Sequence, residues 1–204
     1  MRLQTKIMLP LASPSDQVSQ VSLLRFVNLM GKNTMLLYDA LLSDKRIIFA
    51  SSRNLSLSQV QNFLFAAASM IAPLQGIFNK IKPFVPLAAM AELEAADEGG
   101  FIAGVTNPMF IENRRCYDVS IQIDEAKLNA DSAYKREAYF DLDQEFIKTL
   151  LARIRQDKIT EEEVRQAFES YTLLMIDLAI SLAQHGNQSA GDTAGLTHNM
   201  KPLS

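Results

Sequence analysis

The sequence predicts an α/β fold: a doubly wound, mostly parallel sheet flanked by helices and followed by a helical annex. Short β-branched runs that are apolar on both faces predict the sheet, because such runs are typical of strands buried between layers of helices. Helical periodicity between these runs gives the alternation of a βαβ unit. From Asp143 onward the apolar residues recur at helical spacing alone, which predicts the annex.

The same patterns divide the chain into three parts. We expect residues 1–130 to form the α/β lobe and residues 131–185 to form a helical part packed on it. Residues 186–204 are rich in Gly, Ser, Thr and Asn, a composition that predicts a disordered polar tail.

Four segments carry a strand pattern, and a fifth contains two prolines that favour an edge strand or a loop. The four are residues 3–9, 46–50, 101–105 and 117–123, and the fifth is residues 81–87. In the segment 117–123, the apolar residues Val119, Ile121 and Ile123 alternate, so we expect them to share one face of the strand.

Capping signals place the helices of the lobe. Gly31 is positioned to end a helix over residues 21–30, and Thr34 is positioned to cap a short second helix. Ser56 is positioned to cap a third helix, over residues 57–72.

The annex carries two amphipathic helices. Thr160 and Glu163 form a capping-box pattern, which predicts the start of a helix that continues to about Gln184. We expect it to pair with the preceding helix as an αα-hairpin. The stripe of the first helix is Phe146, Ile147, Leu150, Leu151 and Ile154; that of the second is Val164, Ala167, Phe168, Tyr171, Leu174, Met175, Leu178 and Leu182.

Composition excludes several classes of protein. The 204 residues are 48% hydrophobic and 21% charged, as in globular domains, and the net charge of -3 gives no basic field for nucleic acid. One cysteine, Cys116, and two histidines nearly exclude a His/Cys zinc site, and a single cysteine suits a reducing, cytosolic compartment. No apolar stretch reaches the roughly 18 residues of a membrane span.

No group of residues has the pattern of a catalytic centre. His185 lies at a helix end and His198 in the polar tail, and the acidic residues Glu92, Glu94, Asp97 and Glu98 have the pattern of a solvated loop. Gly99 and Gly100 precede a strand instead of opening a helix, so they do not form a phosphate-binding loop. We therefore expect no catalytic residues, no metal and no cofactor. Met70, Met90, Met109 and Met175 are expected to fill the core.

The segment from Gly104 to Phe110 ends a buried strand with a turn, and two interpretations are open. It can be a strand-to-turn connection in which Phe110 packs as an anchor. Alternatively, residues 107–115 shape a contact surface at the carboxyl end of the strand, with Asn107 in the turn and Arg114 and Arg115 as its charged tip.

A second carboxyl-end position follows the run 46–50, where Arg53 and Asn54 stand. An ordinary βα loop is one interpretation of this position and a partner contact is the other. The predicted partner-binding residues are therefore Arg53, Asn54, Asn107, Arg114 and Arg115.

Taken in order, several segments resemble the DENN domain. Residues 41–51 (LLSDKRIIFAS) resemble its LL-x-x-K-R-I-[IL]-F-x-S segment. The helix from Leu57, the PFVPL run at 83–87 and the segment FIAGVTNPMF at 101–110 follow in the order of that family. Tyr117-Asp118-Val119, continuing to Asp124, resembles its next strand. Residues 4–10 and the GVTNP form are most similar to the fungal polarity-axis branch of DENN proteins, which works with an Arf-type GTPase.

The resemblance covers roughly residues 3–125, and more loosely the helices after Asp143. It implies the α/β lobe and helical part of a module that binds a small GTPase of the Arf or Rab family and often speeds GDP release. It also implies a longin-like N-terminal lobe as a partner, most of which this chain lacks. The implied setting is cytoplasmic, with recruitment to the cell cortex or to vesicle membranes through partners.

Three functions remain open from the sequence. The first is the lobe of a guanine nucleotide exchange factor or regulator in polarised growth or membrane traffic, which needs no catalytic residue because it acts by differential binding. The second is a non-catalytic polarity scaffold that docks the GTP-bound GTPase. The third is an unrecognised small-molecule enzyme, which would need converging titratable groups that the sequence does not supply.

Overall fold

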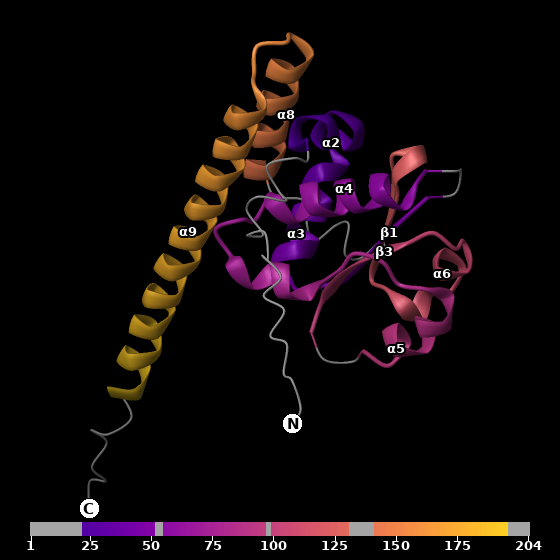
Figure 1. The fold of residues 1–204 in the computed structure, drawn as a ribbon. Coiled ribbons are helices and arrows are strands. Elements are labelled where there is room, and N and C mark those ends of the chain that lie inside the picture. The colour runs from indigo at the N-terminus through magenta and orange to yellow at the C-terminus, as the bar shows by residue number, and fades with distance from the viewer. Residues whose placement is uncertain (1–21, 52–54, 97–98, 131–140, 196–204) are drawn as a thin grey trace, which may run out of the picture.

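The computed structural model describes residues 22–51, 55–96, 99–130 and 141–195 (Figure 1). The predicted opening strand at residues 3–9 lies outside the described residues, as does His198. Among the helices that the structure describes, none is long and apolar enough to cross a membrane.

A five-stranded sheet forms the centre of the fold, with the strand order β2-β3-β1-β4-β5. The first four strands in this order are parallel, and β5 pairs antiparallel with β4. The strands are β1 (Arg46–Ala50), β2 (Ile81–Lys82), β3 (Phe101–Val105), β4 (Val119–Gln122) and β5 (Lys127–Ala130). The mostly parallel α/β fold is thereby confirmed, with the proline-flanked β2 at one edge.

Helices cover both faces of the sheet, so the side chains of the central strand alternate between two cores. Ile47 and Phe49 of β1 point into the larger core, beneath α2, α3 and α4, whereas Ile48 and Ala50 point into a smaller core on the opposite face. The covering helices of the first face are α2 (Leu23–Met30), α3 (Asn33–Leu42) and α4 (Leu57–Ser69).

Shorter elements cover the second face. They are η2 (Leu87–Ala89), α5 (Met90–Glu94), α6 (Met109–Glu112) and η3 (Arg114–Cys116). Phe110 is fully buried in the smaller core, as expected of an anchor, and the Tyr117 hydroxyl donates a hydrogen bond to the Ile111 carbonyl oxygen. Two further 3-10 turns, η1 (Gln75–Lys80) and η4 (Ile123–Glu125), connect the strands.

The helical annex, α8 (Asp141–Arg155) and α9 (Glu161–Gly195), packs outside α2 and α3 (Figure 1). Phe146 of α8 stacks on Tyr171 of α9 with ring centroids 4.3 Å apart, and the Tyr171 hydroxyl donates to the buried Asp143 carboxylate. The predicted αα-hairpin is therefore confirmed.

Two capping boxes form as the sequence predicts. The Ser56 hydroxyl accepts from the backbone N–H of Gln59, whose side chain accepts in return from the Ser56 N–H. Thr160 and Glu163 make the same reciprocal pair at the start of α9. Gly31 ends α2 with a φ of +55°, the left-handed region that favours glycine.

Some local predictions are wrong. Thr34 does not cap α3: the tight turn after Gly31 starts the helix at Asn33, so Thr34 lies inside the helix with its side chain buried. The strand β5 follows a left-handed turn at Ala126, which its short and half-polar sequence did not reveal. Helix α9 ends at Gly195 instead of near Gln184. Residues 186–195 of the expected polar tail are therefore helical.

The acidic segment before β3 is only partly a solvated loop. Glu92 and Glu94 lie in α5, and the Glu94 carboxylate accepts a hydrogen bond from the Asn113 side chain, whereas Glu92 is exposed. Asp97 and Glu98 lie outside the described residues. Met109 is not core either: its side chain is 52% exposed, because the first turn of α6 presents it to solvent while Phe110 turns inward.

Candidate interaction site at the carboxyl edge of the sheet

The connections that leave β1 and β3 diverge to opposite faces of the sheet. After β1 the chain continues into α4, which packs on the larger core through Val60 and Leu64. After β3 it continues into α6, which packs on the smaller core through Phe110. Because β1 and β3 are parallel neighbours, their carboxyl ends meet at a topological switch point, where ligands and partners commonly bind α/β proteins. We call this side of the molecule the carboxyl edge.

At the β1 side of the carboxyl edge, two serine side chains stabilise the connection from β1 to α4 by hydrogen bonds. The Ser51 hydroxyl accepts a hydrogen bond from the Leu55 N–H across the βα loop, and Ser56 caps α4 directly afterwards. Arg53 and Asn54 belong to this loop but lie outside the described residues, so their contact role stays a prediction.

The β3 side is shaped by Asn107. Its side-chain oxygen accepts a hydrogen bond from the Met109 N–H at 2.9 Å, which fixes the turn that opens α6. Thr106, Pro108 and Met109 around it are exposed. Asn107 therefore serves the geometry of the turn and presents its neighbours to solvent.

The segment after β2 lies against β3 and adds an apolar side chain to the edge. The Val85 N–H donates to the Gly104 carbonyl oxygen, and a Cβ atom at Gly104 would stand 2.5 Å from the Pro83 oxygen. The glycine therefore permits the close approach of the two backbones. Phe84 in this segment is 44% exposed, and with Met109 it gives the edge an apolar character that the sequence analysis missed.

A pocket of about 390 Å³ extends the carboxyl edge toward α2. Its walls come from α2 and α4 and from the loops that follow β1 and β4. The lining residues are Ser22, Arg25, Leu29, Leu55, Gln59, Asn62, Phe63, Ile123 and Asp124. Apolar walls with an arginine, an aspartate and two amides can seat a protein side chain or loop and fix its orientation by hydrogen bonds. The sequence could not reveal this pocket, because its walls come from segments far apart in the chain.

Arg114 and Arg115 lie at the opposite, amino edge of the sheet. Arg46, at the amino end of β1, donates from its guanidinium to the Arg115 carbonyl oxygen at 2.9 Å. The five residues of β1, with a rise of about 3.3 Å each, separate that position from the carboxyl edge. Both arginine side chains are exposed. The structure thus places Asn107 at one edge and the arginine pair at the other, since α6 and η3 carry the chain back across the sheet.

The amino edge is built from ion pairs. Arg46 binds Asp118 through two guanidinium nitrogens, and Asp44 pairs with Lys80. Partial burial acts to raise the pKa of Asp118, but the hydrogen bonds from Arg46 outweigh it and hold the pKa below its usual value. Lys80 holds the pKa of Asp44 low in the same way. These contacts fasten β1, β4 and η1 together at the start of the sheet.

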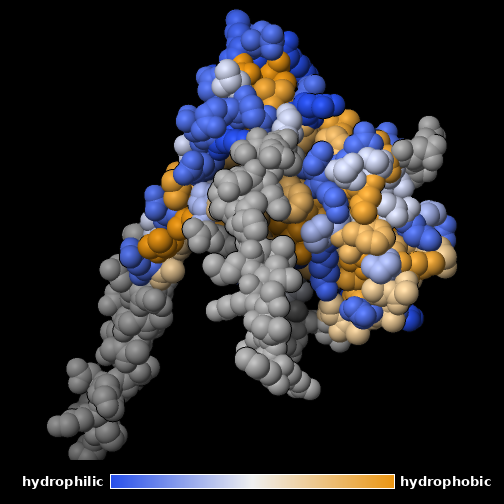
Figure 2. Space-filling model, viewed as in Figure 1, coloured by the Kyte–Doolittle hydropathy of each residue, from blue (hydrophilic) through white to orange (hydrophobic). Residues whose placement is uncertain are grey.

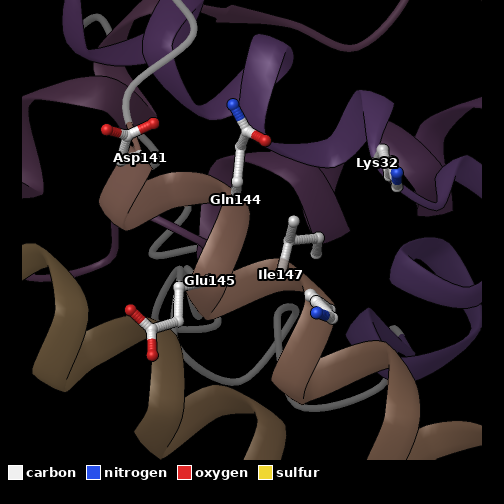
Figure 3. A pocket seen from close by; sticks show the side chains of 6 residues that line it. Lys32, Asp141, Gln144, Glu145 and Ile147 are labelled. Carbon is white, nitrogen blue, oxygen red and sulfur yellow. The ribbon is translucent and has the colours of Figure 1, made fainter.

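A second pocket of about 360 Å³ lies between the α2–α3 turn and the first turns of α8. Figure 3 shows Ile147 between Lys32 on one side and Asp141 and Glu145 on the other. Charges of both signs line this hollow without converging on a common point. Within residues 22–51, 55–96, 99–130 and 141–195, no three His, Cys, Asp or Glu side chains are grouped so as to hold a metal ion.

The strongest pKa shifts lie away from the carboxyl edge. Burial raises the pKa of Asp39 to about 7 and that of Tyr38 to about 12, and it also raises that of Tyr171; all three lie where α8 and α9 pack on α3. Burial also raises the pKa of the Cys116 thiol in the smaller core. None of these four residues lines the pocket at the carboxyl edge.

The fold is that of an α/β domain with a helical annex. The family described as stabilization of polarity axis (SPA) matches residues 20–132, more than half of the chain. The chain belongs to this family, which implies a role in stabilising a polarity axis. The match runs from α2 to β5, so it contains the whole sheet, and it ends before α8. No curated protein matches the chain.

Proposed function

We propose that this chain is a regulatory module that binds a small GTPase of the Arf or Rab family through its carboxyl edge. The observation that carries the proposal is the pocket between α2 and α4, which opens at this edge and continues the surface around the switch point. Membership of the family described as stabilization of polarity axis supports a regulatory role in cell polarity. The resemblance of residues 41–51 and 101–110 to the DENN domain supports the choice of GTPase.

The proposed activity is acceleration of GDP release, with no covalent chemistry and no cofactor. An exchange factor binds the nucleotide-free GTPase more tightly than the GDP form, and the difference sets how far release is accelerated. A 10⁴-fold preference corresponds to about 5.5 kcal/mol, which a standard interface with a few strongly contributing side chains can supply. Mixed apolar and polar groups, as at Phe63, Arg25 and Gln59 of the pocket, suit such an interface.

The proposal includes two partners and a location. A longin-like N-terminal lobe on another chain or segment would complete the grip on the GTPase. The module would work in the cytoplasm and reach the cell cortex or vesicle membranes through its partners. A second candidate function, a scaffold that docks the GTP-bound GTPase, is favoured by the family's description, because stabilising an axis does not itself require nucleotide exchange.

One experiment tests both functions. Release of fluorescent GDP is measured from a panel of purified Arf and Rab GTPases with this chain, alone and together with a longin-like lobe. The proposal expects acceleration for one GTPase and tightest binding to its nucleotide-free form. Binding to a GTP-loaded member without acceleration would replace it with the scaffold. No binding to any member in either nucleotide state would overturn both.

A further inference from the structure

The annex packs on the lobe across a cluster of buried polar side chains. Its members are Tyr38 and Asp39 from α3, Asp143 from α8, and Tyr171 and Thr172 from α9. The Tyr171 hydroxyl donates to the Asp143 carboxylate, which is 3% exposed. The Tyr38 and Thr172 hydroxyl groups, both fully buried, share a hydrogen bond of 3.0 Å. The junction between annex and lobe therefore contains polar and ionisable groups as well as apolar ones.

Asp39 is the member of this cluster whose carboxyl group lacks partners. Its Oδ2 atom is buried and has no hydrogen-bond partner. No Lys, Arg or His side chain of the described residues forms an ion pair with it. Lys32, at the N-cap of α3, lies seven residues or about 10 Å away along the helix and lines the pocket of Figure 3 together with Lys148 of α8. A charge on Asp39 is therefore costly while the annex covers it.

The surroundings of Asp39 supply no charge that would offset this cost. Among the described residues, the ionisable side chains that act on it are Asp143 from α8, Tyr171 from α9 and Tyr38 from α3 itself. Burial, followed by the charge of Asp143, raises the pKa of Asp39 to about 7. The two tyrosines stay uncharged, because burial raises the pKa of both phenols further.

The annex is an outer layer of the fold. Helices α8 and α9 pack outside α2 and α3, and these two helices remain with α4 as the cover of the sheet on that face (Figure 1). Figure 2 shows mainly hydrophilic residues on the visible surface of the hairpin near its loop. Outer elements of a fold can open locally at a lower free energy than its central strands.

We propose that a proton on Asp39 keeps the annex docked on the lobe, and that ionisation of this carboxyl group favours an open state in which α8 and α9 leave α3. In the docked state the ionised group faces Asp143 and finds no donor for its buried oxygen, whereas water solvates both carboxylates in the open state. The open state therefore binds this proton more weakly, and loss of the proton shifts the population toward it.

The sign and the pH range follow from this difference. Docking is strongest at low pH, where Asp39 is protonated in both states. The open state gains population between about pH 4, the ordinary range of an aspartate, and about pH 7, the value in the docked state. The gain is at most tenfold per pH unit, since one proton is involved.

Two backbone amides report directly on the junction. The N–H groups of Leu23 and Leu24, at the start of α2, donate to the Glu161 carboxylate of α9. Amides in the first turn of a helix have no acceptor within that helix, so these two exchange with solvent once Glu161 withdraws. The amides of Ile48 and Ala103, in the central strands β1 and β3, report on unfolding of the sheet.

Hydrogen exchange of the full chain tests the proposal, followed by NMR at pH 5.5 and pH 7.5 with increasing urea. Protection is expressed relative to an unstructured peptide at the same pH. Leu23 and Leu24 should be less protected than Ile48 and Ala103, and their protection should depend less on urea, because opening of the annex exposes less surface than global unfolding. Between pH 5.5 and pH 7.5 their protection should fall at least tenfold.

Two variants identify the group responsible. Asp39→Asn carries an amide that does not ionise, so the fall in protection should disappear. The matched control Asp177→Asn removes an exposed carboxylate of α9 and should keep the fall. Three results would overturn the proposal: a fall that persists in Asp39→Asn, equal protection of Leu23 and Leu24 at both pH values in the wild-type chain, or the same urea dependence for these amides and those of the central strands.

Discussion

Glu161, the first residue of α9, accepts a hydrogen bond from the backbone N–H of Leu23, the first residue of α2, at 2.8 Å. The same carboxylate also accepts from the Leu24 N–H and the Ser22 hydroxyl. One side chain of the annex thus satisfies donors at the open N-terminus of a helix in the lobe, where a negative charge is also favourable. This contact joins the annex to the wall of the pocket at the carboxyl edge, because Ser22 lines that pocket.

Replacing Glu161 should loosen this junction. Glu161→Ala leaves the N-terminal donors of α2 without their partner, and we expect a loss of about 1.5–3 kcal/mol in the free energy of unfolding, the range for hydrogen bonds to charged groups. Glu162→Ala is the matched control, since its side chain is exposed on the next position of the same helix. Urea denaturation of both variants measures the difference, and equal losses would show that the contact with α2 contributes nothing.

Asp39 should make stability depend on pH. Its carboxylate is buried where α3 meets α8 and α9, one of its oxygens has no hydrogen-bond partner, and burial followed by the charge of Asp143 raises its pKa to about 7. The unfolded chain loses this proton near pH 4, whereas the folded protein keeps it until about pH 7. The free energy of unfolding should therefore be highest at low pH. It should fall between about pH 4 and pH 7, by at most about 1.4 kcal/mol per pH unit, and level off above pH 7.

The variant Asp39→Asn removes this titration. Between pH 5 and pH 8 its free energy of unfolding should rise relative to that of the wild-type protein, since the amide has no proton to lose. Denaturation at a series of pH values gives the difference, and Asp177→Asn, on the exposed part of α9, should show no such trend. A pH-independent difference for Asp39→Asn would refute the assignment.

Gly104 should tolerate no side chain. A Cβ atom there would come within 2.5 Å of the Pro83 oxygen, so Gly104→Ala must push the segment after β2 away from β3. Overpacking of this kind costs about 1–3 kcal/mol. Gly76→Ala is the control, because no atom lies within 4 Å of the position its Cβ would take. Thermal unfolding of the two variants should separate clearly, and a Gly104→Ala protein as stable as the control would contradict the close approach seen here.

The elements that the sequence predicted well are those whose signals are local. The runs 46–50 and 101–105 are rich in β-branched and apolar residues, and they form the strands β1 and β3, which pair with each other along their whole length inside the sheet. Ser56 and Thr160 cap their helices through residues three positions away. Thr34 carried the same kind of signal, but tertiary burial overrode it.

The candidate site was less predictable because it depends on long-range placement. The carboxyl-end position of Asn107 follows directly from β3, and the structure has it there. Arg114 is only seven positions further along, yet α6 and η3 carry it back to the amino edge. The short distance between these residues in the sequence does not reveal that they lie at opposite edges of the sheet. Arg25 and Asp124 line the same pocket although they are far apart in the chain.

Binding of the partner should therefore depend on one edge and not the other. Phe84→Asp with Met109→Asp places charge on the apolar part of the carboxyl edge, and we expect the affinity for the GTPase to fall at least tenfold, about 1.4 kcal/mol. Leu142→Asp is the control, an equally exposed apolar position on α8, and should bind as the wild-type chain does.

Arg114→Ala with Arg115→Ala tests the opposite edge in the same assay. If the partner contacts the carboxyl edge alone, this variant should keep most of the affinity, because its side chains lie at the far end of the strands. We would measure exchange rates and binding constants for the three variants, and their melting temperatures to confirm folding. These values show which edge the partner contacts. A strong loss in the arginine variant, together with normal binding of the Phe84 and Met109 variant, would move the interface to the amino edge. Losses in both would mean that the partner spans the face of α6 and η3 from edge to edge.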